Sequence, residues 1–81
     1  MRPGDAMLTR KVRSEFIRRE LDCSRLEVKV IHGVAYLGGE LKGTRARKVF
    51  DTKKEMAFLA DQINRISGIR GIDDRIKWIE L

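Results

Sequence analysis

The residues with nucleophilic, acid–base or metal-binding side chains are few and lie apart. The chain has a single histidine, His32, and a single cysteine, Cys23, so it contains no pair of histidines and no CxxC motif. A lone imidazole without a carboxylate nearby in the sequence lacks the partner that a general base or a nucleophile requires. These residues predict a protein that is not an enzyme and that needs no metal and no cofactor.

Two motifs near the C-terminus also fall short of a catalytic or nucleotide-binding site. Asp73 and Asp74 are adjacent in an expected strand, where successive side chains point to opposite faces, so their carboxyl groups do not form an acid–base pair. The Gly68–Gly71 stretch has the GxxG spacing of the loop with which KH domains clamp RNA. That loop joins two helices, whereas a strand is expected after Gly71, so the match predicts no RNA site.

The strongest chemical signal is the concentration of basic side chains between positions 42 and 54. Six lysines and arginines and one acid, Asp51, give this segment +5 of the chain's net charge of +6. Each such charge contributes about 1 kcal/mol of attraction to an anionic bilayer, and an apolar wedge would strengthen the attachment. The open alternative is a solvated loop that keeps the protein in solution. The set predicted to bind an anionic phospholipid or membrane surface comprises Lys42, Arg45, Arg47, Lys48, Phe50, Lys53 and Lys54.

Two helices are predicted from apolar spacing and from a capping signal. Apolar residues recur every four positions from Leu8 to Phe16 and indicate a helix over residues 7–21. A Thr-Lys-Lys-Glu capping box at residues 52–55 marks the start of the second helix. The first six residues contain a Pro-Gly breaker and are expected to form a flexible N-terminal arm, so that residues 7–81 make up one domain.

Three strands are predicted from the alternation of apolar and polar residues, over residues 26–31, 34–41 and 72–81. The two-residue link His32–Gly33 predicts a tight hairpin between the first two strands. The element order is therefore α-β-β-α-β. With a right-handed crossover, this order predicts an α+β fold: a three-stranded mixed sheet in the order 2-1-3 with both helices packed on one face.

The face of the predicted sheet that carries no helix is the second candidate surface. Apolar side chains with basic neighbours are expected there, a combination typical of an interaction surface. Such a face would serve a homodimer, a partner protein or a lipid surface. The alternative is that these apolar residues are scattered over the surface in the ordinary way. The residues predicted for protein interaction are Ile31, Tyr36, Ile79, Lys29 and Lys77.

The order of these motifs resembles the BON domain family, the small bacterial osmotic-shock and nodulation domain. The resemblance covers about residues 7–80 and rests on LEVKVIHGVAYLGGEL at 26–41, on Gly68–Ile69, and on Ile-Asp-Asp-Arg-Ile at 72–76, which follows the family's Val-x-Asn-x-Leu pattern. The segment 42–51 departs from the family because it is longer and more basic than the usual linker. The resemblance implies a binding module without catalytic residues that attaches to phospholipid or membrane surfaces or takes part in protein assembly.

Length and composition bound the remaining possibilities. A chain of 81 residues forms one small domain with a thin core, so no enclosed small-molecule site is expected. The leading function is attachment to an anionic surface, the alternative is protein–protein interaction or homodimerisation, and non-specific nucleic-acid binding is third. No apolar run reaches transmembrane length and no apolar signal segment follows the first residues, so a cytoplasmic location is expected, with peripheral membrane attachment left open.

Overall fold

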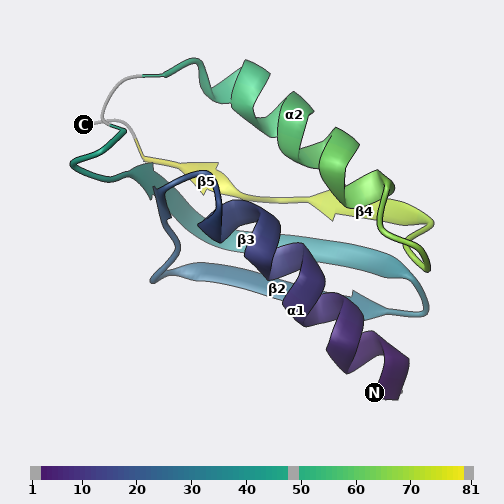
Figure 1. The fold of residues 1–81 in the computed structure, drawn as a ribbon. Coiled ribbons are helices and arrows are strands. Elements are labelled where there is room, and N and C mark those ends of the chain that lie inside the picture. The colour runs from purple at the N-terminus through teal and green to yellow at the C-terminus, as the bar shows by residue number, and fades with distance from the viewer. Residues whose placement is uncertain (1–2, 48–49, 80–81) are drawn as a thin grey trace.

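The sheet is built around one long central strand that pairs on both of its edges (Figure 1). The computed structural model describes residues 3–47 and 50–79. The predicted α+β class and the mixed sheet are confirmed. The elements are α1 (Pro3–Ile17), β1 (Leu21–Asp22), β2 (Leu26–Ile31), β3 (Val34–Gly43), α2 (Thr52–Asn64), β4 (Gly71–Asp74) and β5 (Lys77–Trp78).

The central strand is β3. The antiparallel hairpin with β2 places Lys29 opposite Tyr36, and its turn has positive φ angles at both His32 and Gly33, as a tight two-residue turn requires. On the other edge, β4 and β5 run parallel to β3, and Asp73 stands opposite Tyr36. The predicted hairpin and the predicted parallel relation between the second and third strands are thus confirmed.

The predicted strand order 2-1-3 is wrong, because β3 rather than β2 lies between the other strands. The handedness rule constrains how the chain crosses from β3 through α2 to β4, but it does not say whether another strand lies between them. The third strand is also divided into β4 and β5. Between these two strands, Arg75 keeps contact with β3, since it donates its backbone N–H to Leu37 O at 2.8 Å.

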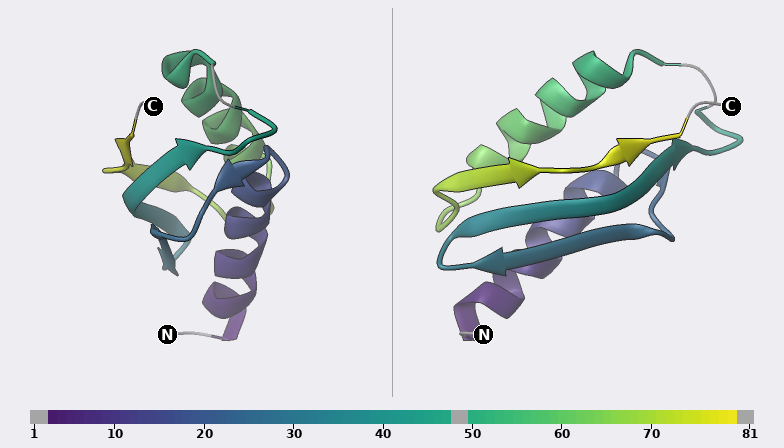
Figure 2. Two further views of the ribbon diagram at one scale, coloured as in Figure 1. Left: turned by 90° about the vertical axis from the view of Figure 1, so that its left-hand side faces the viewer. Right: turned by 180° about the vertical axis from the view of Figure 1, so that it is seen from behind.

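Both helices lie on one face of the sheet, as predicted (Figure 2). Each helix contributes one apolar stripe, and these stripes meet the side chains of β2 and β3 that point to the same side. In α2 the stripe is Leu59 and Ile63, both fully buried. Within the described ranges 3–47 and 50–79, the opposite face of the sheet carries no helix. The buried core consists of Val12, Phe16, Leu21, Leu26, Val30, Ala35, Leu37, Leu41, Leu59 and Ile63.

The first helix begins and ends four residues earlier than predicted. It starts at Pro3, so a flexible arm is wrong from Pro3 onward, and residues 1–2 lie outside the described residues. Proline is tolerated in a first helical turn because its missing N–H has no partner there. The helix ends at Ile17, and the positive φ of Glu20 turns the chain so that Leu21 enters the sheet in β1.

The second helix starts at the predicted capping box but one residue earlier, because its N-cap is Asp51 rather than Thr52. Asp51 is the N-cap, and its carboxylate accepts hydrogen bonds from the backbone N–H groups of Lys53 and Lys54 at 3.0 and 3.2 Å. Thr52 is therefore the first helical residue. The reciprocal role of Glu55 in a capping box is wrong as well, because its carboxylate is turned away from the cap toward two arginines.

Candidate functional surfaces

A buried carboxylate, Glu55, organises the segment between β3 and α2. Its side chain is only 4% exposed. Arg19 donates from Nε to Oε2 at 2.8 Å and from Nη2 to Oε1 at 3.0 Å. Arg47 donates from Nη1 to Oε2 at 2.7 Å and from Nη2 to Oε1 at 2.9 Å. Two bidentate arginines thus hold one carboxylate and tie the turn after α1, the β3–α2 segment and α2 together.

The ionisation of this cluster follows from its hydrogen bonds. Those from Arg19 and Arg47 lower the pKa of Glu55 from 4.5 to about 2, against the opposing effect of burial. The same bonds to Glu55 raise the pKa of both arginines. Arg47 was expected to meet an anionic surface, but its guanidinium group is held by Glu55 inside the fold.

The aromatic residue of the basic segment is also engaged within the protein. Phe50 packs against the core, and its ring meets that of Trp78 edge to face with centroids 5.9 Å apart. The guanidinium of Arg47 lies over the same ring, 4.7 Å from its centroid. Phe50 is therefore not the exposed apolar wedge that the sequence predicted. Arg19 covers a second ring, that of the exposed Phe58, at 4.3 Å.

The remaining members of the predicted basic set differ in their surroundings. Lys42 belongs to β3 rather than to a loop, and its Nζ lies 3.6 Å from Asp22 Oδ2. Lys48 lies outside the described residues. Arg45, Lys53 and Lys54 are exposed, and none of them has an ion-pair partner within residues 3–47 and 50–79.

The outer sheet face, defined as the face without helices, carries the second predicted set. Tyr36 is 42% exposed there, directly opposite Lys29 on β2. Ile31 is exposed beside the hairpin turn, whereas Ile79 donates its backbone N–H to Leu41 O near the other end of β3. Lys77 stands opposite Glu40, also away from Tyr36. The predicted residues therefore share a sheet but do not form one apolar centre.

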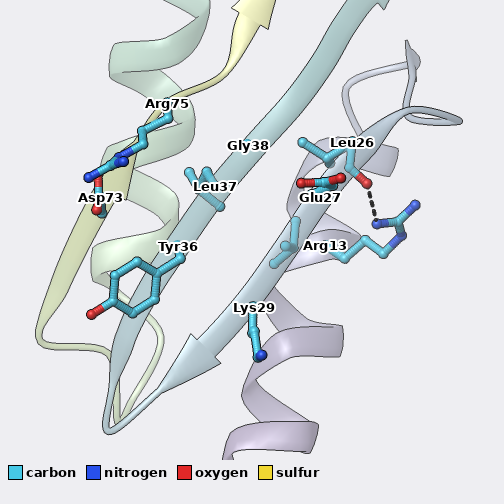
Figure 3. A pocket seen from close by; sticks show the side chains of 10 residues that line it. Arg13, Leu26, Glu27, Lys29, Tyr36, Leu37, Gly38, Asp73 and Arg75 are labelled. Carbon is cyan, nitrogen blue, oxygen red and sulfur yellow. Dashed lines mark hydrogen bonds and ion pairs between the residues drawn. The ribbon is translucent and has the colours of Figure 1, made fainter.

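An open hollow of about 780 Å³ lies on the outer sheet face beside Tyr36 (Figure 3). Its walls include charged side chains of both signs from the flanking strands. Asp73 and Arg75 form an ion pair at 3.2 Å on one side. On the other side stand Glu27 and Lys29, two residues apart on β2. The floor includes Gly38, which contributes no side chain, so this glycine keeps the hollow open.

The backbone requires glycine at one of the two adjacent glycine positions of β3 but not at the other. Gly39 has a φ of 75°, and a Cβ there would overlap the carbonyl oxygen of Arg25, so only glycine fits. Gly38 has no positive φ, and an added Cβ would meet only Glu27 Oε2, at an ordinary 3.6 Å. A glycine in mid-strand that the backbone does not require is typical of a place where a ligand or another chain approaches closely.

The free edge of β2 is covered by side chains of α1. Thr9 Oγ1 accepts a hydrogen bond from the backbone N–H of Val30 at 3.0 Å. Arg13 Nη1 donates to Leu26 O at 3.1 Å, and Asp5 Oδ2 accepts from the backbone N–H of His32 at 3.4 Å. These contacts occupy edge groups that another strand would otherwise pair with. The signal in the sequence is the polar i, i+4, i+8 series beside the apolar stripe of α1.

Cys23 and the aspartates 73 and 74, the residues first considered for catalysis, do not lie together in one site. Burial raises the pKa of the Cys23 thiol, whose Sγ lies 3.5 Å from Leu21 O. Asp73 and Asp74 lie on opposite sides of the sheet, as predicted: Asp73 lines the outer hollow, and Asp74 lines a hollow beside α2. Among the described residues, no three His, Cys, Asp or Glu side chains are grouped as metal ligands.

Comparison with family models, with curated protein sequences and with solved structures finds no match to this chain. Within residues 3–47 and 50–79, no helix has the length and apolar character needed to cross a bilayer. The fold and the surfaces define a small α+β domain with one helix-covered sheet face and one bare sheet face.

Proposed function

We propose that this chain is a non-catalytic binding module and that its outer sheet face binds another protein. The observation that carries the proposal is the hollow at Gly38 beside the exposed Tyr36. Tyrosine is enriched at protein interfaces because it offers a large rigid apolar ring and one polar group. The BON-like order of motifs supports the same function, since that resemblance implies a binding module without catalytic residues.

The distribution of charge supports a protein partner on this face. Charges of both signs line the hollow: the anions Glu27 and Asp73 and the cations Arg13, Lys29 and Arg75. Mixed charges favour a partner with its own pattern of charges over a uniformly anionic surface. A cytoplasmic setting belongs to the proposal, because Cys23 is a free thiol and the chain has no second cysteine to join it.

The proposal is tested by comparing four immobilised baits in a lysate of the organism that encodes the chain. The baits are the wild type, Tyr36→Ser, Gly38→Val and the control Ile17→Ser, which removes an exposed apolar side chain from α1. We expect at least one protein that the wild type and the control capture equally and that both face variants lose. If the four baits capture the same proteins in the same amounts, the outer face is not a binding surface.

A second candidate, attachment to an anionic membrane surface, is favoured by the exposed cations Arg45, Lys53 and Lys54. Together with the net charge of +6, they provide attraction that needs no pocket. Lys53 and Lys54 use their backbone N–H groups in the α2 cap, so replacing their side chains leaves the cap intact.

This candidate is tested by flotation with anionic and zwitterionic vesicles at physiological salt. Membrane attachment predicts that the wild type floats only with anionic vesicles and that a triple glutamine variant at positions 45, 53 and 54 does not float. The wild type remaining at the bottom of the gradient with both vesicle types would exclude this function.

A further inference from the structure

The outer sheet face carries both the hollow and, beside it, a protruding side chain, Tyr36, whose shape and charged neighbours complement the hollow. This inference rests on the proposed function and names the occupant of its site. Tyr36 and Gly38 are two residues apart on β3, so both positions lie on the outer face. Tyr36 places a large side chain there, whereas Gly38 has none. A protrusion and a hollow of this kind fit a second copy of the same surface, provided that the copy is turned end to end.

On each flanking strand, the residue level with Tyr36 and the residue level with Gly38 carry opposite charges. The register sets Glu27 beside Gly38 and Lys29 beside Tyr36 on one flank. On the other flank, Asp73 stands beside Tyr36, and Arg75 follows after two residues and donates its backbone N–H to Leu37 O, next to Gly38. On each of the three strands, the outward residue level with Tyr36 therefore complements, in size or in charge, the outward residue of the same strand that is level with Gly38.

We propose that the outer sheet face binds a second copy of this chain, with the two-fold axis level with Leu37 and perpendicular to the strands. Such an axis lays each strand over its own copy in the reverse direction. The ring of Tyr36 then enters the hollow over Gly38 of the second copy. Glu27 meets Lys29 of the second copy, and Asp73 meets Arg75, each pair occurring twice, as an isologous contact requires.

Sheet spacing and net charge agree with this arrangement. Two sheets packed face to face are about 10 Å apart, which leaves room for one interdigitated layer of side chains. A tyrosine opposite a glycine fits that layer, whereas two opposed tyrosines would not. The charges that the strands contribute to the hollow, Glu27, Lys29, Asp73 and Arg75, sum to zero, although the chain carries +6. The fifth charged lining residue, Arg13, extends from α1 and donates to Leu26 O, so the strands of two copies approach each other without net repulsion.

The test follows self-association by sedimentation and light scattering from micromolar to millimolar concentrations. We expect Tyr36→Ser and Gly38→Val each to weaken the dimer by about tenfold or more, the loss typical of an interface anchor. The control Ile17→Ser leaves the dimer unchanged. Valine is favoured in strands, so Gly38→Val should keep or raise the melting temperature, which separates loss of the dimer from unfolding.

A charge exchange identifies the second copy as the occupant. In Lys29→Glu alone, two glutamates face two glutamates across the axis, and in Glu27→Lys alone, lysines face lysines. Both variants should be monomeric by themselves and should associate when they are mixed, because each then offers the opposite charge to the other. The variant with both substitutions should regain the wild-type dimer.

Three results overturn this inference. The first is a wild type that stays monomeric at millimolar concentration, and the second is a dimer that both face variants retain. The third is a mixture of the two charge variants that stays monomeric. A monomeric wild type whose capture of another protein still depends on Tyr36 and Gly38 overturns only the second copy as occupant, whereas equal capture by all baits overturns the proposed function too.

Discussion

The hydroxyl of Thr9 on α1 accepts a hydrogen bond from the backbone N–H of Val30, 3.0 Å away on the edge of β2. The hydroxyl in turn donates to the carbonyl oxygen of Asp5 at 2.7 Å. Four helical residues advance about 6 Å, and two strand residues advance nearly as far, at about 6.7 Å. Polar residues at every fourth position of α1 can therefore reach successive backbone groups along this edge, at His32, Val30 and Leu26. The helix therefore covers this edge of the sheet with side-chain hydrogen bonds.

Replacing Thr9 by valine keeps the shape of the side chain and removes the acceptor for the Val30 N–H. Because Val30 is fully buried, we expect a loss of about 1–3 kcal/mol in the free energy of unfolding. Amide hydrogen exchange at Val30 should become faster by a matching factor. The control Thr9→Ser retains the hydroxyl and should retain the protection. Equal exchange rates in the valine and serine variants would show that the hydrogen bond does not protect this edge.

The two adjacent glycines of β3 are expected to respond in opposite ways to alanine. Gly39→Ala forces a side chain into a left-handed conformation and against the carbonyl group of Arg25, so it should cost about 2 kcal/mol or more. Gly38→Ala meets no such obstacle and should leave stability unchanged or raise it by up to about 1 kcal/mol. Urea denaturation of both variants measures the difference. A similar loss at both positions would contradict the inference that Gly38 is glycine for a reason other than the fold.

Removing the charge of Glu55 is expected to destabilise the fold. Glu55→Gln leaves Arg19 and Arg47 without a counter-charge beside the core, with an expected loss of about 3 kcal/mol. The matched control is Asp61→Asn on the same helix, where the exposed carboxylate pairs with the exposed Arg65 at 3.1 Å and is worth at most about 0.5 kcal/mol. Equal losses in the two variants would mean that burial adds nothing to the arginine cluster.

The same carboxylate predicts how stability depends on pH. The pKa of Glu55 is about 2 in the folded chain and 4.5 in the unfolded chain, so the folded state binds the proton less tightly than the unfolded state. Its contribution of about 3 kcal/mol is therefore present above pH 4.5 and is lost as the pH falls toward 2. The difference in unfolding free energy between the wild type and Glu55→Gln should shrink over that range. A difference that stays constant down to pH 2 would contradict the assignment.

The sequence by itself determined the class of the fold and most of its elements. The apolar stripe from Leu8 to Phe16 and the alternation in residues 26–31 and 34–41 report burial, which is a local property of each element. The His32–Gly33 turn is local in the same sense, because its two residues supply the backbone angles that the hairpin needs. Local burial and turn geometry can be read without knowing which elements are neighbours.

The tertiary structure alone decided which strand is central and which charges are free. The handedness of the crossover is the same whether or not a strand lies between β3 and β4, so the order depended on packing across the whole sheet. Arg47 looked like part of a basic loop because Glu55 and Arg19 lie 8 and 28 residues away from it. Gly38 and Gly39 cannot be told apart in the sequence, whereas in the structure the positive φ of Gly39 and the adjacent carbonyl group of Arg25 mark it as the glycine that the backbone requires. In each case the deciding contact joins residues of different segments of the chain, so the residue spacing within one element carries no information about it.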